Sequence, residues 1–338
     1  MDGHRVADNQ AEIDFWVRLR DGAEPHNRVP IWRPAETPGA DLKFPPVDNG
    51  LDYLVSVVDF LAPDEDRQAP SARALKYAVL HLQAAAEVLL KARLEAAHWT
   101  LVAEDITRRK VTRAKFEQGD FNSIAPDEAV RRLRDIVGVE IPTEAATNLD
   151  ALHKKRNALQ HYGLNATQED IEPVAAKVLD FLIAFLDETL LPALDPAVRA
   201  RAENDMTYVR RGLHLIQSFV AARLERLAPE LAGLEDRTVQ CTRCFQDTLV
   251  AGDGEAPETA RCRFCHVAFA PEVIAAEYVG VHNAGMFASG ATEVCTKCGG
   301  TEAVVRHVIR VCDLRPDQAY GIHDSVTFCF ACAAPAGE

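Results

Sequence analysis

Three side chains near the middle of the chain could together bind a phosphate and move a proton beside it. Arg156 and Asn157 are adjacent, and His161 follows after three further residues. A guanidinium binds phosphate through two parallel N–H donors, and an imidazole exchanges a proton near neutral pH. An asparagine between them can orient either group by hydrogen bonding. We therefore take Arg156, Asn157 and His161 as candidate catalytic residues.

These residues must be positioned by a helix, since the residues from Thr143 to Gly163 follow a helical pattern that ends at a glycine. Three leucines of this segment share one side of the expected helix (Leu149, Leu152, Leu159). Arg156 falls on the same apolar side, where a guanidinium is costly to bury without a partner. His153, Asn157 and His161 recur every four residues and line the next side.

The R-x4-H spacing of Arg156 and His161, near the end of a helix in an all-α region, resembles the signature of HEPN domains. The segment EVLLKARLEAAHW, with Glu87 and Lys91 four residues apart, and the segments GDFNSI and RLRDIVG resemble one bacterial group of this family. The resemblance covers about Ser71 to Leu191. Many HEPN domains are metal-independent endoribonucleases that act as toxins or in anti-phage defence. In these domains two protomers pair, and the R-x4-H motif of each protomer faces one shared cleft. The resemblance therefore implies RNA as substrate or ligand and a homodimer formed through the helical region.

The roles within this motif follow from ribonuclease chemistry without a metal, in which the 2′-hydroxyl of the RNA attacks the adjacent phosphate. Arg156 would hold the phosphate, His161 would act as general acid, and Asn157 would orient one of them. The structural alternative pairs Arg156 with a carboxylate and makes His161 a helix-end cap. Glu87 is expected to form a salt bridge with Lys91, and a role as a further active-site group is the alternative. One toxin branch has a tyrosine two residues after the histidine, whereas here Tyr162 follows directly, so that role is not carried over.

Eight of the nine cysteines form C-x-x-C pairs in the last hundred residues, which favours metal binding over disulfides in a reducing compartment. Two pairs at zinc-ribbon spacing predict each site, and the expected ligands are Cys241, Cys244, Cys262 and Cys265 for the first and Cys295, Cys298, Cys329 and Cys332 for the second. Four thiolates leave no open position, so both sites are expected to be structural zinc sites. Pairing across the two units and a rubredoxin-type iron are the alternatives, because sulfur ligation does not choose the metal.

Two further residues of this region are expected to stay outside the metal sites. Cys312 ends a β-prone run and is expected to be a buried, apolar cysteine. We call each C-x-x-C pair a knuckle; His266 directly follows the second knuckle, Cys262 to Cys265, and is not expected to bind the metal.

The net charge of −14 argues against a protein that coats nucleic acid non-specifically. Two local basic clusters are present, at 108–115 and 154–156, and either could be a solvated helix face. No apolar run is long enough to span a bilayer, and the N-terminus lacks the apolar core of a signal peptide. We therefore expect a cytoplasmic protein that does not bind membranes.

The expected fold is mainly α, a helical HEPN-like domain followed by two small β-rich zinc ribbons. The predicted divisions are a Pro-rich extended arm at 1–48, a helical domain at 49–195, one long connector helix at 196–235, and ribbons at 238–270 and 290–334. Within the helical domain we expect helices at about 51–61, from Ser71 to about Trp99, at 127–137, at 143–163, and at 172–190 with Pro173 in its first turn.

Two functions fit these features. The first is a metal-independent HEPN-type endoribonuclease with a composite site formed by two protomers. Its zinc ribbons would bind a target or a partner protein. An antitoxin or another regulatory protein could inhibit its activity. The alternative is a non-catalytic HEPN adaptor that binds nucleotides or nucleic acid. A transcription-associated zinc-ribbon protein would explain the cysteines but leave the Arg156 motif unused.

Overall fold

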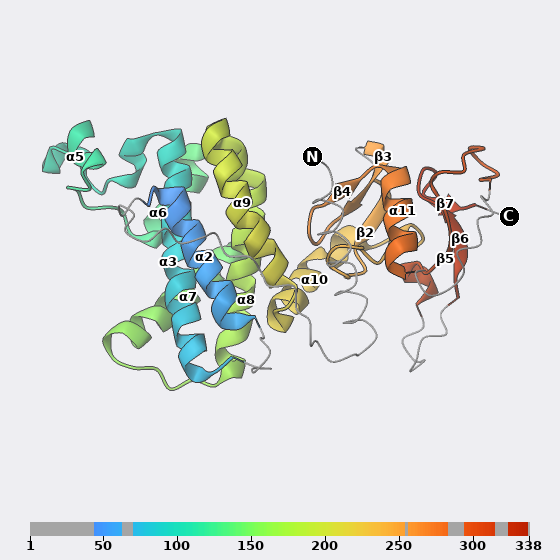
Figure 1. Cartoon of the computed structure of the whole chain (residues 1–338). Coiled ribbons are helices and arrows are strands. Elements are labelled where there is room, and N and C mark those ends of the chain that lie inside the picture. The colour runs from blue at the N-terminus through green and yellow to red at the C-terminus, as the bar shows by residue number, and fades with distance from the viewer. Residues whose placement is uncertain (1–43, 63–69, 254–255, 283–293, 315–323, 337–338) are drawn as a thin grey trace, which may run out of the picture. The chain divides into compact units, whose positions relative to one another are not determined.

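The computed structural model describes residues 44–62, 70–253, 256–282, 294–314 and 324–336. These residues form two compact bodies, a helical body that ends at Arg223 and a cysteine body that begins at Leu224 (Figure 1). The mainly helical fold with small sheets beside the cysteines confirms the predicted fold class. The predicted arm at 1–48 lies largely outside the described residues. Its last three residues instead begin the first helix shown, α2 (Pro46–Leu61).

The helical body is a bundle around α3 (Ala72–Ala97), which packs against α2, α7 and α8 (Figure 1). The other elements are the short α4 (Ile106–Arg109) and α5 (Arg113–Glu117), α6 (Pro126–Arg132) with its π-turn at Leu133–Val137, α7 (Thr143–His161), α8 (Gln168–Phe185) with its π-turn at Leu186–Leu190, and α9 (Pro196–Leu213). The predicted helices at 127–137 and 143–163 are confirmed to within a few residues. The two short helices α4 and α5 were not predicted.

Helix α3 begins at Ser71, as the sequence predicts, because the Ser71 side chain accepts a hydrogen bond from the backbone N–H of Ala74. One of its faces is buried along the whole helix by alanines and leucines. The packing against α2 is close at Gly50, where an added Cβ would lie 2.5 Å from a methyl group of Leu89. A glycine is therefore required at this crossing.

Helix α8 begins earlier than the sequence predicted. Thr167 caps it: its hydroxyl accepts from the backbone N–H of Asp170, and the Asp170 carboxylate accepts from the backbone N–H of Thr167, so the first helical residue is Gln168. Pro173 consequently lies inside the helix and not at its start. Thr167 and Asp170 bond two backbone N–H groups at the start of the helix. If the helix began at Pro173, its first N–H groups would have only water as a partner, which explains the earlier start.

The prediction of one long connector helix at 196–235 is wrong. The segment forms α9 and a second helix, α10 (Gln217–Leu231), separated by a turn at 214–216. Helix α9 belongs to the helical body, since Tyr208 donates to Asp59 of α2 at 2.5 Å and Gly212 lies directly against Val58. The turn buries Ile216 in the core, which a straight helix would carry away from it.

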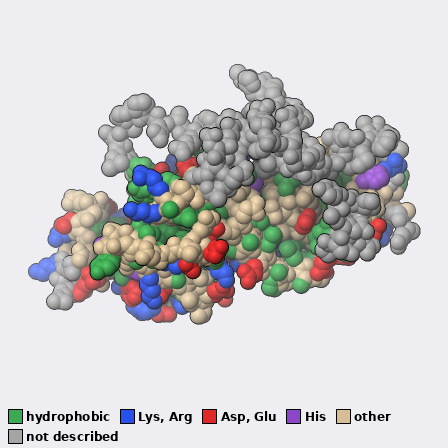
Figure 2. Space-filling model, turned by 90° about the horizontal axis from the view of Figure 1, so that it is seen from below, with side chains coloured by type: hydrophobic (Ala, Val, Ile, Leu, Met, Phe, Trp, Pro, Cys, Tyr) green, Lys and Arg blue, Asp and Glu red, His purple; other side chains and the backbone are tan. Residues whose placement is uncertain are grey.

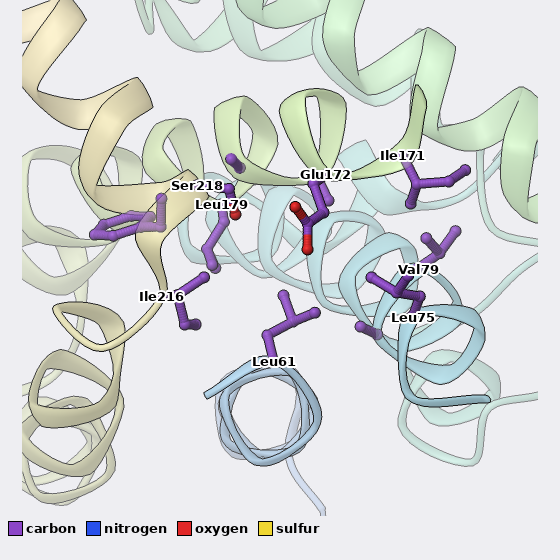
Figure 3. A pocket seen from close by; sticks show the side chains of 12 residues that line it. Leu61, Leu75, Val79, Ile171, Glu172, Leu179, Ile216 and Ser218 are labelled. Atoms are coloured by element: carbon purple, nitrogen blue, oxygen red, sulfur yellow. The ribbon is translucent and has the colours of Figure 1, made fainter. Parts of the chain in front are cut away.

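The core of the helical body is closely packed where four segments meet. Figure 3 shows side chains of α2, α3, α8 and the α9–α10 connection converging, among them Leu61, Val79 and Leu179. The space left between them is about 10 Å³, about what one water molecule occupies. This seam therefore stabilises the bundle and is not a ligand site.

The cysteine body holds two antiparallel sheets and one helix. The first sheet has the order β1 (Thr238–Val239), β2 (Leu249–Asp253), β3 (Ala256–Cys262) and β4 (Ala268–Phe269), and the second has the order β5 (Val304–Val308), β6 (Val326–Cys329) and β7 (Ala334–Pro335). Between them lies α11 (Pro271–His282), which was not predicted. Arg243 of the first cysteine unit donates to Glu277 of α11 at 2.6 Å, and the ring of Tyr278 lies 5.8 Å from that of Phe330 of the second unit, tilted by 51°. The two ribbons are therefore parts of one packed body.

Candidate functional site

Helix α7 carries the three candidate catalytic residues, and the structure brings two of them into contact. The guanidinium of Arg156 donates from Nη1 to Asn157 Oδ1 at 2.9 Å. Arg156 is half-buried, as its position on the leucine side of the helix predicts. Within the described part of the chain, no carboxylate forms an ion pair with it. The salt-bridged alternative for Arg156 therefore has no partner among those residues.

The contact continues away from Arg156 through His153 to a second helix. Asn157 Nδ2 lies 2.8 Å from His153 Nε2, and His153 Nδ1 lies 3.4 Å from the carboxamide of Gln83 on α3. Because arginine only donates, Asn157 presents its oxygen to Arg156 and its N–H to the imidazole. On the other side of the ring, the atom of Gln83 that faces Nδ1 is its amide nitrogen, Nε2. Arg156 thus sets the direction of the two hydrogen bonds made by Asn157.

His161 lies apart from this chain, at the exposed end of the helix. The helix ends because Gly163 has a φ of +118°, a conformation that favours glycine, and the Gly163 N–H donates to the carbonyl of Ala158 at 2.6 Å. Tyr162 is 99% exposed. Among the described residues, no side-chain hydrogen bond joins His161 to Arg156 or Asn157. The single chain therefore presents the cation and the imidazole on successive turns and not as one bonded triad.

Glu87 and Lys91 form the ion pair that the sequence suggested, with Lys91 Nζ 2.6 Å from Glu87 Oε1. Lys91 also donates to the Ser123 hydroxyl at 2.9 Å, so it ties the GDFNSI loop to α3. Two segments that the sequence grouped only by resemblance are therefore in direct contact.

A cavity of about 500 Å³ lies between α3, α6 and α7, beside the Arg156 chain. Its polar lining consists of Gln83, Glu87, Asp127, Asp150 and His153, and its apolar lining includes Ala86, Leu90, Val130 and Leu149. His153 therefore belongs both to the cavity wall and to the chain that orients Arg156. Gln83 was not predicted to contact His153, although a glutamine inside an Ala/Leu-rich helix is a visible signal.

The cysteines come together in two groups of four, in the sequential pairing that the spacing predicted. In the first group, Sγ of Cys241 lies 3.8 Å from that of Cys265, and Sγ of Cys244 lies 3.6 Å from that of Cys262. In the second group the corresponding distances are 3.8 Å for Cys295 and Cys332 and 3.9 Å for Cys298 and Cys329.

These distances fit metal sites and not disulfides, whose sulfurs lie about 2.0 Å apart. Four sulfurs held about 2.3 Å from one ion in a tetrahedron lie about 3.8 Å from each other. Both groups could therefore hold a metal ion in a closed, four-thiolate site. His266 is not a member of either group, in agreement with its prediction as a bystander.

Each of the four cysteine knuckles is closed by a residue in the left-handed conformation directly after its second cysteine. These residues have positive φ angles of 57° at Phe245, 60° at His266, 72° at Gly299 and 51° at Ala333. The N–H groups of Phe245 and His266 each donate back to the first cysteine of their knuckle at 3.0 Å. The turn aims both thiols of a knuckle to the same side, and the non-glycine residues bear strain there.

Backbone donors in the second group favour a thiolate. Burial raises the pKa of Cys295, but hydrogen bonds from the backbone of Cys298 and Lys297 outweigh it and lower that pKa to about 7. In the first group, burial raises the pKa of Cys262 while bonds from the neighbouring thiols lower it below its usual range. The pKa of a neighbouring thiol is raised instead, at Cys244 in the first group and at Cys332, to about 12, in the second, so the thiols within each group lose their protons unequally.

Cys312 corrects one prediction, because it is exposed and not buried. It lies in a short 3₁₀ turn at Val311–Asp313, where its N–H donates to the carbonyl of Glu235 and its Sγ lies 3.6 Å from Asp313 Oδ1. The β-prone run ends before it, since β5 stops at Val308. The turn directs this side chain out of the sheet.

No protein-family model, curated protein or solved structure matches this chain. In the described residues, none of the helices has both the length and the apolar character that a membrane span requires.

Proposed function

We propose that this protein is a metal-independent endoribonuclease of the HEPN type. The observation that carries the proposal is the hydrogen-bonded chain from Gln83 through His153 and Asn157 to Arg156. A guanidinium held by an amide, with no carboxylate pairing with it among the described residues, keeps its charge available for a phosphate. Holding such a cation half-buried has a stability cost that a phosphate-binding function would explain.

In the proposed reaction, the 2′-oxygen of a ribose attacks the adjacent phosphorus and the bond from phosphorus to the 5′-oxygen breaks. The products are a 2′,3′-cyclic phosphate and a free 5′-hydroxyl. Arg156 would neutralise the charge that develops on the phosphate oxygens. His161 would give its proton to the leaving 5′-oxygen.

A composite site made by two copies accounts for the separation between His161 and the Arg156 chain. His161 lies at the exposed end of its helix and is accessible to a second protomer. In a dimer, the Arg156 of one copy and the His161 of the other could face one phosphate. We therefore propose a homodimer through the helical body, and an antitoxin or regulatory protein could act by blocking that surface.

The cysteine body is proposed to bind two zinc ions and to recognise the target or a partner. Zinc accepts four thiolates at the observed spacing and carries no redox chemistry, and iron is the alternative. Elemental analysis of the purified protein is expected to give two zinc ions per chain.

The second candidate function, binding of nucleotides or nucleic acid without cleavage, is favoured by the charge distribution. The chain has a net charge of −14, and the described surface in Figure 2 intersperses basic and acidic side chains. Such a surface does not hold a long polyanion by charge alone, so any RNA would be bound at a local site.

The deciding experiment is RNA cleavage in magnesium-free buffer by the full, metal-loaded chain. Wild type is expected to produce cyclic-phosphate ends, and Arg156→Ala and His161→Ala are each expected to lose activity by about a hundredfold or more. Arg156→Lys keeps the charge but not the bidentate donors and should also be impaired. Arg199→Ala, which removes an exposed arginine of α9, is the matched control and should retain full activity.

Mixing the two inactive variants tests the composite site. A heterodimer of Arg156→Ala and His161→Ala chains retains one arginine and one histidine on opposite protomers, so mixing is expected to restore activity in part. Light scattering should give twice the monomer mass. Binding of RNA without cleavage by any form would favour the second function, and neither binding nor cleavage would overturn both.

A further inference from the structure

We propose that His153 is a positioning residue of the Arg156 site, and that it holds Arg156 in place for a phosphate only while its imidazole is unprotonated. This inference rests on the proposed function and specifies how that site is regulated, since acid should turn it off. The three side chains involved, His153, Arg156 and Asn157, all belong to α7 and are each half-buried.

Asn157 is the restraint on the Arg156 side chain. Among the described residues, the guanidinium makes one hydrogen bond, from Nη1 to Asn157 Oδ1 at 2.9 Å. A guanidinium has several further N–H donors, and these are left for a phosphate. Because a single bond aims the cation, the position of Arg156 depends on how the Asn157 carboxamide is itself held.

His153 holds that carboxamide by accepting a hydrogen bond. With its oxygen facing Arg156, Asn157 has only N–H groups left to offer, and its Nδ2 lies 2.8 Å from His153 Nε2. Nε2 must therefore be the unprotonated nitrogen of the ring, and a neutral imidazole has only one such nitrogen. The contact on the other side of the ring, from Gln83 Nε2 to Nδ1, is longer at 3.4 Å and therefore weaker. The bond to Asn157 thus determines the tautomer.

A second proton on the ring removes this acceptor. The N–H at Nε2 of His153 would then face the N–H groups of Asn157, and the carboxamide can relieve the repulsion by turning its oxygen to the ring. That turn takes the oxygen away from Arg156, which leaves a donor facing the guanidinium and frees the side chain to move. Imidazole is the side chain that ordinarily changes charge between pH 5 and 8, so the switch is expected in that range.

The charged groups described around His153 are carboxylates and lysines. Those of the cavity wall that His153 shares are carboxylates, two of them ion-paired: Glu87 of α3 with Lys91, Asp150 of α7 with Lys154, and Asp127 of α6. On the α8 side, Lys177 pairs with Glu144 at the start of α7, about two and a half turns before His153. Such groups ordinarily keep their charge between pH 5 and 8, so the proposed switch depends on the imidazole.

A histidine that acted only through its charge would have the opposite effect. An imidazolium near Arg156 attracts a phosphate, so acid would then strengthen the site instead of weakening it. Glutamine separates the two roles, because its amide oxygen can accept from Asn157 at about the reach of Nε2 and does not titrate. His153→Gln should therefore keep Arg156 in place at every pH, and His153→Leu should lose this restraint at every pH.

Nuclear magnetic resonance of the ring nitrogens tests the hydrogen bond in the full, metal-loaded chain without any cleavage. The His153 signals are identified as those that His153→Gln removes, and the side-chain amide signal of Asn157 as the one that Asn157→Asp removes. At pH 8 the ring should carry a proton on Nδ1 and none on Nε2. Acid should protonate Nε2 and shift the Asn157 signal over the same pH range. An Nε2–H tautomer at pH 8, or an Asn157 signal that does not follow the titration, would overturn the inference.

The pH profile of RNA cleavage tests the consequence for the site. Wild-type activity should fall about tenfold on acidification, over the range in which the His153 signals titrate. His153→Gln should lose this fall, and His153→Leu should be about tenfold less active than wild type before acidification. His98→Gln, which removes an exposed histidine of the helical body, is the matched control and should keep the wild-type profile.

The outcomes separate this inference from the proposed nuclease. Circular dichroism checks that each variant folds, and His153→Gln carries the test if His153→Leu does not fold. Cleavage that strengthens over the His153 titration, or an acid loss that is unchanged in His153→Gln, overturns the inference and leaves the nuclease standing. If no form cleaves RNA, the nuclease fails, and the ring-nitrogen signals decide whether His153 holds Asn157.

Discussion

The two bodies of this chain are stabilised in different ways. In the helical body the most buried side chains are aliphatic, such as Leu54, Leu82 and Leu152, each fully inaccessible to solvent. In the cysteine body, the cysteines themselves belong to the buried set, and Cys241, Cys262 and Cys295 are equally inaccessible. These cysteines share the core with fully buried apolar side chains, such as Leu249, Phe328 and Phe330. Apolar packing stabilises both bodies, and among the described residues the cysteine body alone also contains two groups of four cysteines that could add metal ligation to its folding free energy.

The largest effect expected from this difference is that of metal removal. A strong chelator should unfold residues 238–336 and leave the helical body folded, because a structural zinc site contributes on the order of 10 kcal/mol. Limited proteolysis and circular dichroism would detect the loss of one body only, and added zinc should restore it. A protease-resistant cysteine body in the metal-free chain would contradict the assignment.

The helical body should instead be sensitive to its buried ion pair. Arg223 is 1% exposed and donates to Asp180 at 3.1 Å. Asp180→Ala leaves a buried guanidinium without its carboxylate and should lower the free energy of unfolding by about 3–5 kcal/mol, as measured by urea titration. Glu188→Ala, which removes an exposed acid of the following turn, should change it little. The zinc content should be the same in both variants.

Acid should destabilise the helical body through His214. Burial lowers the pKa of His214 to about 4, and the hydrogen bond to the carbonyl of Arg210 offsets this only in part. The unfolded chain binds a proton near pH 6.5, so stability is full above that pH and is lost as the pH falls towards 4. Between pH 7 and pH 5 the loss should be about 2 kcal/mol. In the His214→Gln variant, the free energy of unfolding, measured by urea titration of the helical circular dichroism signal, should lose this part of its pH dependence. If the free energy of unfolding varies with pH as it does in the wild type, His214 is not the group responsible.

The smallest effect concerns the knuckle turn at His266. Its φ of 60° is strained for a residue with a side chain, so His266→Gly should stabilise the metal-bound cysteine body by about 1 kcal/mol. Because His266 is not a ligand, the zinc content should not change. Loss of one zinc ion from this variant would instead make the histidine a ligand.

Local signals explain which parts of the structure could be predicted. The Ser71 cap, the Gly163 end of α7 and the C-x-x-C spacing each act over a few residues, so the sequence shows them directly. Helix α11 was not predicted, although Pro271 and Glu272 are typical of a helix start. Its residues lie between two cysteine units, and the cysteine spacing of those units favours strands. The break between α9 and α10 depends on packing against α2, which no local pattern reports.

The sequence by itself determined the ligand sets, the helix that carries Arg156, Asn157 and His161, and the residue types available for chemistry. Spacing along one chain was enough for these, since knuckles and helix faces are local geometry. Only the tertiary structure decided that Gln83, 70 residues away from His153, meets it beside a cavity. Contacts of that kind depend on how α3 packs against α7, and therefore on the burial of many side chains at once.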